Sequence, residues 1–175
     1  MSRLEQFLLF VLDRTHRIGI KDLSRFQLFK ISYLIQVLSL KYAGKEFIPN
    51  LVFIRHKNGP ISTDIYHAID ELQGKGYISK EISKKEDYEY ARYGHKLIKK
   101  IPKLNFSKGE TIFLDNFLSE ILPLSQNKLK QYAYTTEPMK EIIRKEKGEI
   151  KTGVVIDFST VIVDPDVVNS YADEL

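Results

Sequence analysis

Few residues in this sequence have the chemistry that catalysis or metal binding requires. The 175 residues include no cysteine, which excludes disulfides, thiolate nucleophiles and cysteine-ligated zinc. Four histidines lie far apart, and none has a carboxylate or a second histidine at ligand spacing: His16, His56, His67 and His95. A glycine-rich phosphate loop, an H-E-x-x-H pair and a G-x-S-x-G elbow are absent. The sequence therefore predicts no catalytic residue, no metal ligand, no cofactor and no enzymatic activity.

The cationic residues are a second group with clear chemistry, because they can contact phosphates. The chain carries 27 Lys and Arg against 23 Asp and Glu, a net charge of +4. Residues 153–175 hold five acids and no base, so the rest of the chain carries +9. A basic body of this kind is compatible with nucleic acid and with an acidic protein partner.

Much of the positive charge falls in one strip of the sequence. Six bases and no acid lie between residues 91 and 109, and two lysines precede them. The candidate phosphate contacts are Lys84, Lys85, Arg92, Lys96, Lys99 and Lys100. The alternative interpretation is a solvated lysine face, whose aliphatic stems cover apolar residues beneath.

Tyrosine, at ten of 175 residues, suits protein interfaces as well as half-buried strands. In residues 88–93 the alternation places Tyr88 and Tyr90 on one face of an expected strand. These two residues and Arg92 are the candidate partner-binding residues. The alternative is that this face packs against the preceding helix.

Apolar spacing at three and four residues predicts a mainly helical chain that positions these groups. Helices are expected over residues 3–14, 22–42, 62–74, 96–101, 108–121, 125–134 and 138–147. Asp22, Ser62 and Ser107 are the expected N-caps. The helix over 22–42 is apolar on two sides, which is typical of a helix at the centre of a core.

Between the helices, two strand-like runs over 77–83 and 88–93 form an expected hairpin with its tip at 84–87. Helix, glycine, hairpin and helix is the order of a winged helix. The expected fold class is therefore α+β and mainly helical, with a winged-helix-like centre at 62–101 and the hairpin as its wing. Additional C-terminal helices and a short β-like tail follow.

The helix over 62–74 would occupy the recognition position of such a fold. It contains Asp64, Asp70 and Glu71 but no lysine or arginine. Carboxylates near phosphates oppose the electrostatic attraction on which DNA binding depends. The charge pattern therefore favours a protein partner over DNA.

We expect one mainly helical domain over residues 1–151 and an acidic extension of β and helical character over 152–175. Apolar runs at 154–156 and 161–163 predict a strand or hairpin in the extension. It could complete the domain's own sheet or pair across a homodimer. No apolar run approaches the length that spans a bilayer, so we expect a cytoplasmic protein with no membrane contact.

Several short motifs follow one another along the chain: residues 28–34, Gly59-Pro60, Ile65-Tyr66 and residues 125–139. Their order resembles that of the Panacea family, the SocA-like antitoxin domain. The four segments are similar, in turn, to the family's K-L-L-Y-L helix, its G-P turn, its I-Y pair and its closing L-S-x-x-x-L … E-P-W segment. The resemblance spans roughly residues 23–143. The carried-over motif residues are Lys30, Tyr33, Gly59, Pro60 and Tyr66.

The sequence departs from the family pattern near its end. Tyr134 or Thr135 stands where the family usually has a histidine, and Met139 replaces the aromatic residue.

The resemblance implies a non-enzymatic protein that neutralises a toxin by direct contact, or that delivers the toxin to a protease. We interpret the motif residues as mostly structural, because Gly59-Pro60 sets a turn and the tyrosines pack. The second hypothesis is a winged-helix transcription regulator that contacts phosphates through the hairpin and residues 91–109. A metal- or nucleotide-dependent enzyme is the third.

Overall fold

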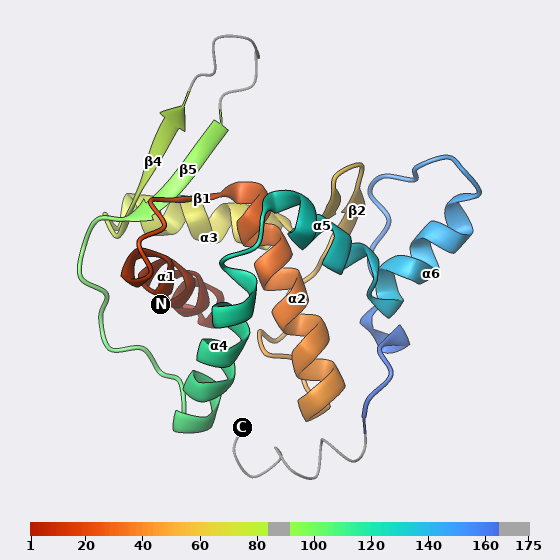
Figure 1. The fold of residues 1–175 in the computed structure, drawn as a ribbon, viewed down its shortest axis with the longest axis horizontal. Helices are drawn as coiled ribbons and strands as arrows, with labels where there is room; N and C mark the ends of the chain where they lie inside the picture. Colours follow the sequence, from red (N-terminus) through yellow and green to blue (C-terminus); the bar gives the residue numbers. More distant parts are fainter. Residues whose placement is uncertain (84–91, 165–175) are drawn as a thin grey trace. The chain divides into compact units, whose positions relative to one another are not determined.

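The computed structural model describes residues 1–83 and 92–164 (Figure 1). Lys84, Lys85, Tyr88 and Tyr90 lie outside the described residues. The described chain is mainly helical with two small antiparallel sheets, which confirms the predicted α+β, mainly helical class. It divides into two compact units: residues 1–28 with 64–105, and residues 29–63 with those from 106 onward.

The first unit is built from helices and a three-stranded sheet. Its elements are α1 (Arg3–Arg17), β1 (Leu23–Ser24), α3 (Thr63–Gly74), β4 (Ile78–Ser83) and β5 (Arg92–Leu97). The sheet order is β1-β5-β4, so that β1 adds to the expected hairpin. In the register, Leu23 lies opposite His95 and Ile78 opposite Leu97. Helix α1 contacts β5, and most of its residues from Leu4 to Leu12 are buried.

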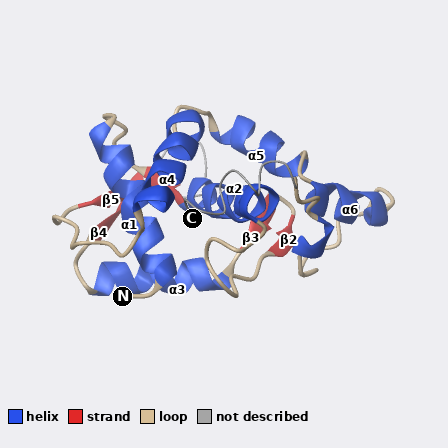
Figure 2. Ribbon diagram, turned by 90° about the horizontal axis from the view of Figure 1, so that it is seen from below, coloured by secondary structure: helices blue, strands red, loops and turns tan. Residues whose placement is uncertain are grey.

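The second unit is helical around a short hairpin. Its elements are most of α2 (Arg25–Ala43), β2 (Ile54–His56), β3 (Gly59–Ile61), α4 (Lys108–Ile121), α5 (Gln126–Tyr134), α6 (Glu137–Glu146) and a 3₁₀ turn (Phe158–Thr160). Strands β2 and β3 lie side by side (Figure 2). Aromatic rings form part of the core, since Tyr33, Phe53 and Phe158 contact one another with centroids 5.4–5.9 Å apart.

Several helix ends lie where local sequence signals place them. Ser107 and Glu110 form a reciprocal capping box at the start of α4, and Ser125 caps α5 through its hydroxyl. Helix α2 ends before Gly44, whose φ of +66° suits glycine. Helix α3 begins directly after Ser62, although the Ser62 hydroxyl is buried without a hydrogen-bond partner among the described residues.

Two other local predictions are wrong. Asp22 does not cap α2: the helix starts later, and the hydroxyl of Ser24 accepts from the backbone N–H of Gln27 at 3.3 Å. Residues 96–101 are not helical, because β5 runs to Leu97 in register with β4 and residues 98–101 form no helix. In the tail, the strand-like pairing expected at 154–156 is present, since Val155 bridges to Ile54 and so extends the chain's own sheet.

In the described residues, no helix is both long enough and apolar enough to cross a bilayer.

Candidate functional site

The β2–β3 hairpin is the element that brings motif residues together. Its register pairs His56 with Gly59 and Arg55 with Pro60 across a two-residue turn. Pro60 has no N–H, but the backbone N–H and C=O of Arg55 point away from it, to Val154 and Gly153 at 2.7 and 2.8 Å. Proline therefore occupies a position of this hairpin where no ladder donor is needed.

Lys30, on α2, reaches the hairpin with a buried ammonium group. The residue is only 3% exposed, and its Nζ lies 3.4 Å from the carbonyl oxygen of Pro60. Burial, and then the neighbouring charges of Lys130 and Arg55, lower the pKa of Lys30 to about 7. A lysine in this setting is poised between its charged and neutral forms at neutral pH.

Gly59 allows this close approach. Its φ is +102°, a region that residues with a side chain rarely adopt. A Cβ built on it would lie 3.1 Å from Cε of Lys30 and 3.2 Å from Cε2 of Tyr134. Both the backbone conformation and the lack of space therefore require glycine here.

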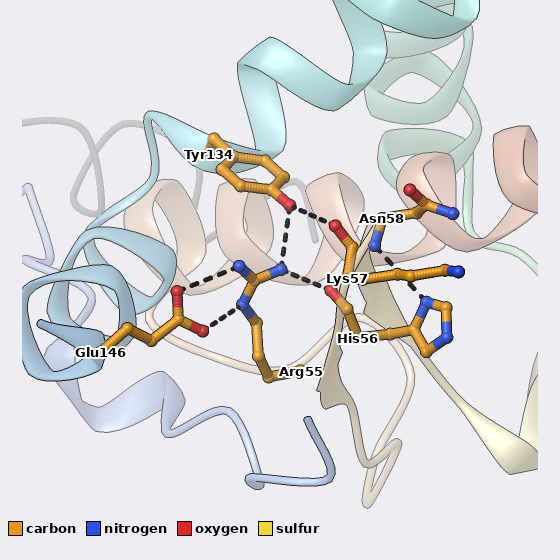
Figure 3. A network of polar contacts seen from close by, with 6 residues as sticks. All are labelled: Arg55, His56, Lys57, Asn58, Tyr134 and Glu146. Atoms are coloured by element: carbon orange, nitrogen blue, oxygen red, sulfur yellow. Dashed lines mark hydrogen bonds and ion pairs between the residues drawn. The ribbon is translucent and has the colours of Figure 1, made fainter. Parts of the chain in front are cut away.

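Arg55 is the centre of a polar network behind the hairpin (Figure 3). The residue is 2% exposed, and its guanidinium donates to both carboxylate oxygens of Glu146, at 2.7 and 3.1 Å. It also donates to the hydroxyl of Tyr134 at 2.9 Å and to the carbonyl of His56. The hydrogen bond from Arg55 is the main reason that the pKa of Glu146 is lowered. The network joins β2 to α5 and α6.

Tyr33 and Thr136 form a second buried polar contact in the same unit. The Tyr33 hydroxyl lies 2.7 Å from Oγ1 of Thr136, and Tyr33 is fully buried. Burial raises the pKa of Tyr33, so that the phenol stays protonated. Thr136 directly precedes α6, and this contact therefore holds α2 to the start of α6.

The remaining candidates belong to the first unit. Tyr66 is half-buried on α3, and the Arg25 guanidinium lies 4.6 Å from its ring centroid. Lys96 is half-buried, whereas Lys99 and Lys100 are exposed, with Nζ of Lys99 4.9 Å from the Tyr77 ring. Arg92 begins β5.

The motif residues thus fall into two groups. Lys30, Gly59 and Pro60 meet at one point of the second unit, whereas Tyr66 belongs to the first. Arg55 and Glu146 were not identified from the sequence. An arginine within the apolar run of residues 51–55 was the available signal, because such a charge needs a partner if it is buried.

The chemistry of this cluster is that of packing and charge pairing. Among the residues that the structure describes, no three histidines or acids gather closely enough to hold a metal ion. Its polar groups are buried or half-buried and are paired with one another or with the backbone.

Comparison with models of known families identifies the family of this chain. The family model for the antitoxin SocA-like Panacea domain matches residues 28–138, and the chain belongs to this family. The matched region includes most of α2, the β2–β3 hairpin, α3 and the start of α6. A search of curated proteins found no match. A search of solved structures found none either.

Proposed function

We propose that this protein is a non-catalytic antitoxin, which neutralises a protein toxin by binding it directly or delivers the toxin to a protease. The observation that carries the proposal is the family match over residues 28–138. The proposed site of action is the cytoplasm, and the proposed toxin is encoded by an adjacent gene.

The burial of the motif residues supports a structural role for them, separate from toxin binding. Four of the motif residues are buried and cannot contact a partner directly: Lys30, Tyr33, Gly59 and Pro60. Partner recognition would then fall to the surface outside these motifs. We therefore propose that the motif residues are structural and that residues outside the motifs select the toxin; Tyr88, Tyr90 and Arg92 are the sequence-based candidates.

A growth experiment tests the proposed function. The product of the adjacent gene is expressed from one inducible promoter and this chain from another. Expression of the neighbour alone should arrest growth, and expression of both should restore it. An arrest that this chain does not relieve, or a neighbour without toxicity, would count against the proposal.

A winged-helix DNA-binding regulator is the alternative, and one observation favours it. In the first unit, α3 leads into the β4–β5 hairpin, and the short β1 joins the same sheet, which is an order that winged helices have. The exposed Lys99 and Lys100 follow that hairpin. Against it, the exposed face of α3 carries Asp64, Asp70 and Glu71.

Gel-shift titration with duplex DNA tests this alternative. If it holds, affinity falls steeply as salt rises, and reversing the charges in Lys99→Glu/Lys100→Glu weakens binding further. Absence of a shift at low salt would dismiss it.

A further inference from the structure

A strand edge lies beside the β2–β3 hairpin in the second unit, where residues 153–156 add to β2. Three backbone hydrogen bonds hold it there: Gly153 N to Arg55 O at 2.8 Å, Arg55 N to Val154 O at 2.7 Å, and Ile156 N to Phe53 O at 2.8 Å. Val155 lies opposite Ile54 in a non-hydrogen-bonded antiparallel pair. The N–H and C=O of Val155 therefore point away from β2, and neither is hydrogen-bonded to another described residue.

The side chains at this edge are apolar and exposed. Val155 is 60% exposed and Val52 is 50% exposed, whereas their neighbours Phe53 and Ile156 are buried. Along residues 51–53 this alternation is that of a strand with one buried and one outer face, whereas in the tail Val154 as well as Val155 is exposed. The outer face here is aliphatic, where a solvated sheet would carry polar residues.

A groove of about 480 Å³ continues from this edge, between residues 46–52 and residues 155–159. Leu51, Val52 and Phe158 supply apolar lining, and the charged residues that line it, Glu46 and Asp157, are both acids. Hydrogen bonds from Ser159 lower the pKa of Asp157, which keeps its carboxylate charged at neutral pH. The groove is therefore apolar, and its charged residues are negative.

We propose that this edge and groove bind an extended, strand-like segment of the toxin that bears aliphatic side chains and a lysine or arginine. The proposal rests on the proposed function in one respect, that the segment belongs to a toxin. The partner's backbone pairs with the N–H and C=O of Val155, which is strand addition at an open edge. Its aliphatic side chains pack on Val52 and Val155, and its cation faces Glu46 and Asp157.

Charge argues against the chain's own C-terminal end as the occupant. Residues 164–175 hold four acids and no base, so they would meet carboxylates of like sign at the rim. A second copy of the chain is the other occupant that the experiment must separate.

The experiment uses the full-length chain and a phage-displayed library of random heptapeptides, and so does not require a known toxin. Selected peptides should alternate aliphatic residues and contain lysine or arginine. Their affinity is then measured by fluorescence polarisation for Val155→Lys and for Val155→Asp. These variants remove the same aliphatic area but place opposite charges at the edge. Ile98→Lys, at an exposed aliphatic residue of the first unit, is the matched control.

We expect Val155→Lys to weaken peptide binding at least about tenfold, because a cation then faces the peptide's own cation. Val155→Asp should weaken it much less, and Ile98→Lys should leave it unchanged. Removing the rim charges in Glu46→Gln/Asp157→Asn should also weaken binding, while the amide oxygen that replaces the Asp157 carboxylate can still accept from Ser159. Unchanged thermal unfolding of each variant shows that the fold is retained.

Three results would overturn this inference: no enriched peptides, acidic enriched peptides, or affinity that Val155→Lys does not change. Dimerisation in sedimentation runs that Val155→Lys abolishes would also overturn it, because a second copy would then be the occupant. The proposed function fails separately. If the neighbouring gene product is not toxic but the expected peptides are selected, the proposed antitoxin function fails. The peptide-binding site at Val155 then still stands.

Discussion

At the scale of single residues, the contact between Gly59 and Lys30 explains why two sequence motifs 29 positions apart belong together. The aliphatic stem of Lys30 lies 3.1 Å from where a Cβ of Gly59 would stand, and its ammonium reaches the carbonyl of Pro60. Lys30 therefore restricts the residue type at position 59 and contacts the backbone of position 60. Two predictions belong to this scale.

Gly59→Ala should destabilise the protein by about 2–3 kcal/mol, because alanine meets both the positive φ and the contact with Lys30. Gly44→Ala is the matched control in the same unit, since Gly44 has a φ of +66° but nothing within 4 Å of its Cβ position. We expect a cost of about 1 kcal/mol there. Urea unfolding measures both, and equal costs would show that the close contact does not matter.

The buried Lys30 should make stability depend on pH. Its pKa is about 7 in the folded protein, below the ordinary value of 10.5. Between these values the unfolded chain binds a proton that the folded chain lacks, so stability rises with pH, by up to about 1.4 kcal/mol per unit. In Lys30→Met this pH-dependent contribution to the free energy of unfolding is absent. The free energy of unfolding of wild type should therefore rise relative to that of the variant from pH 7 to 9.5.

The comparison stays above pH 7 because burial and nearby cations also lower the pKa of His56, which then titrates below that range. Urea unfolding of both proteins across the series gives the difference. Parallel curves would mean that the folded protein holds Lys30 with an ordinary pKa.

At the scale of elements, the ion pair between Arg55 and Glu146 joins β2 to the end of α6, 91 positions later in the sequence. Residues 153–156 return directly to the other edge of β2. The hairpin is thus held on both sides by segments from the C-terminal part of the chain. Breaking the Arg55–Glu146 pair should therefore lower the free energy of unfolding more than breaking the surface ion pairs on α6.

Glu146→Leu should cost about 3 kcal/mol, because it leaves the buried Arg55 guanidinium without its counter-charge. The double variant Arg55→Leu/Glu146→Leu should recover most of that loss, since neither charge then remains buried. Glu141→Gln, which breaks an exposed pair with Arg144 and Lys145, should leave the unfolding midpoint nearly unchanged. If Glu146→Leu were no less stable than the double variant, the ion pair would not contribute to holding β2 and α6 together.

These elements also show what the sequence can predict. The starts of α4 and α5 at Ser107 and Ser125 depend on neighbours a few residues away, and the sequence predicts them correctly. Strand β3 was missed because Pro60 argues against a strand unless its position needs no donor, which only the pairing reveals. The partner of Arg55 was missed because nothing local selects Glu146 among the acids of the chain.

At the scale of the whole molecule, the sign of charge changes with position. The chain is basic outside its last residues, yet the exposed face of α3 and the rim of the groove beside Val155 are acidic. A surface with both signs suits a protein partner, whereas DNA needs one continuous basic face. The predicted boundary between a domain at 1–151 and an extension at 152–175 remains a prediction.

Isothermal titration of the purified chain with the purified product of the adjacent gene tests the central claim most directly. We predict a saturable heat signal with a stoichiometry near one and a Kd of about 1 μM or tighter. No binding heat with the partner at about 100 μM, together with salt-dependent binding of duplex DNA, would contradict the claim and favour the regulator.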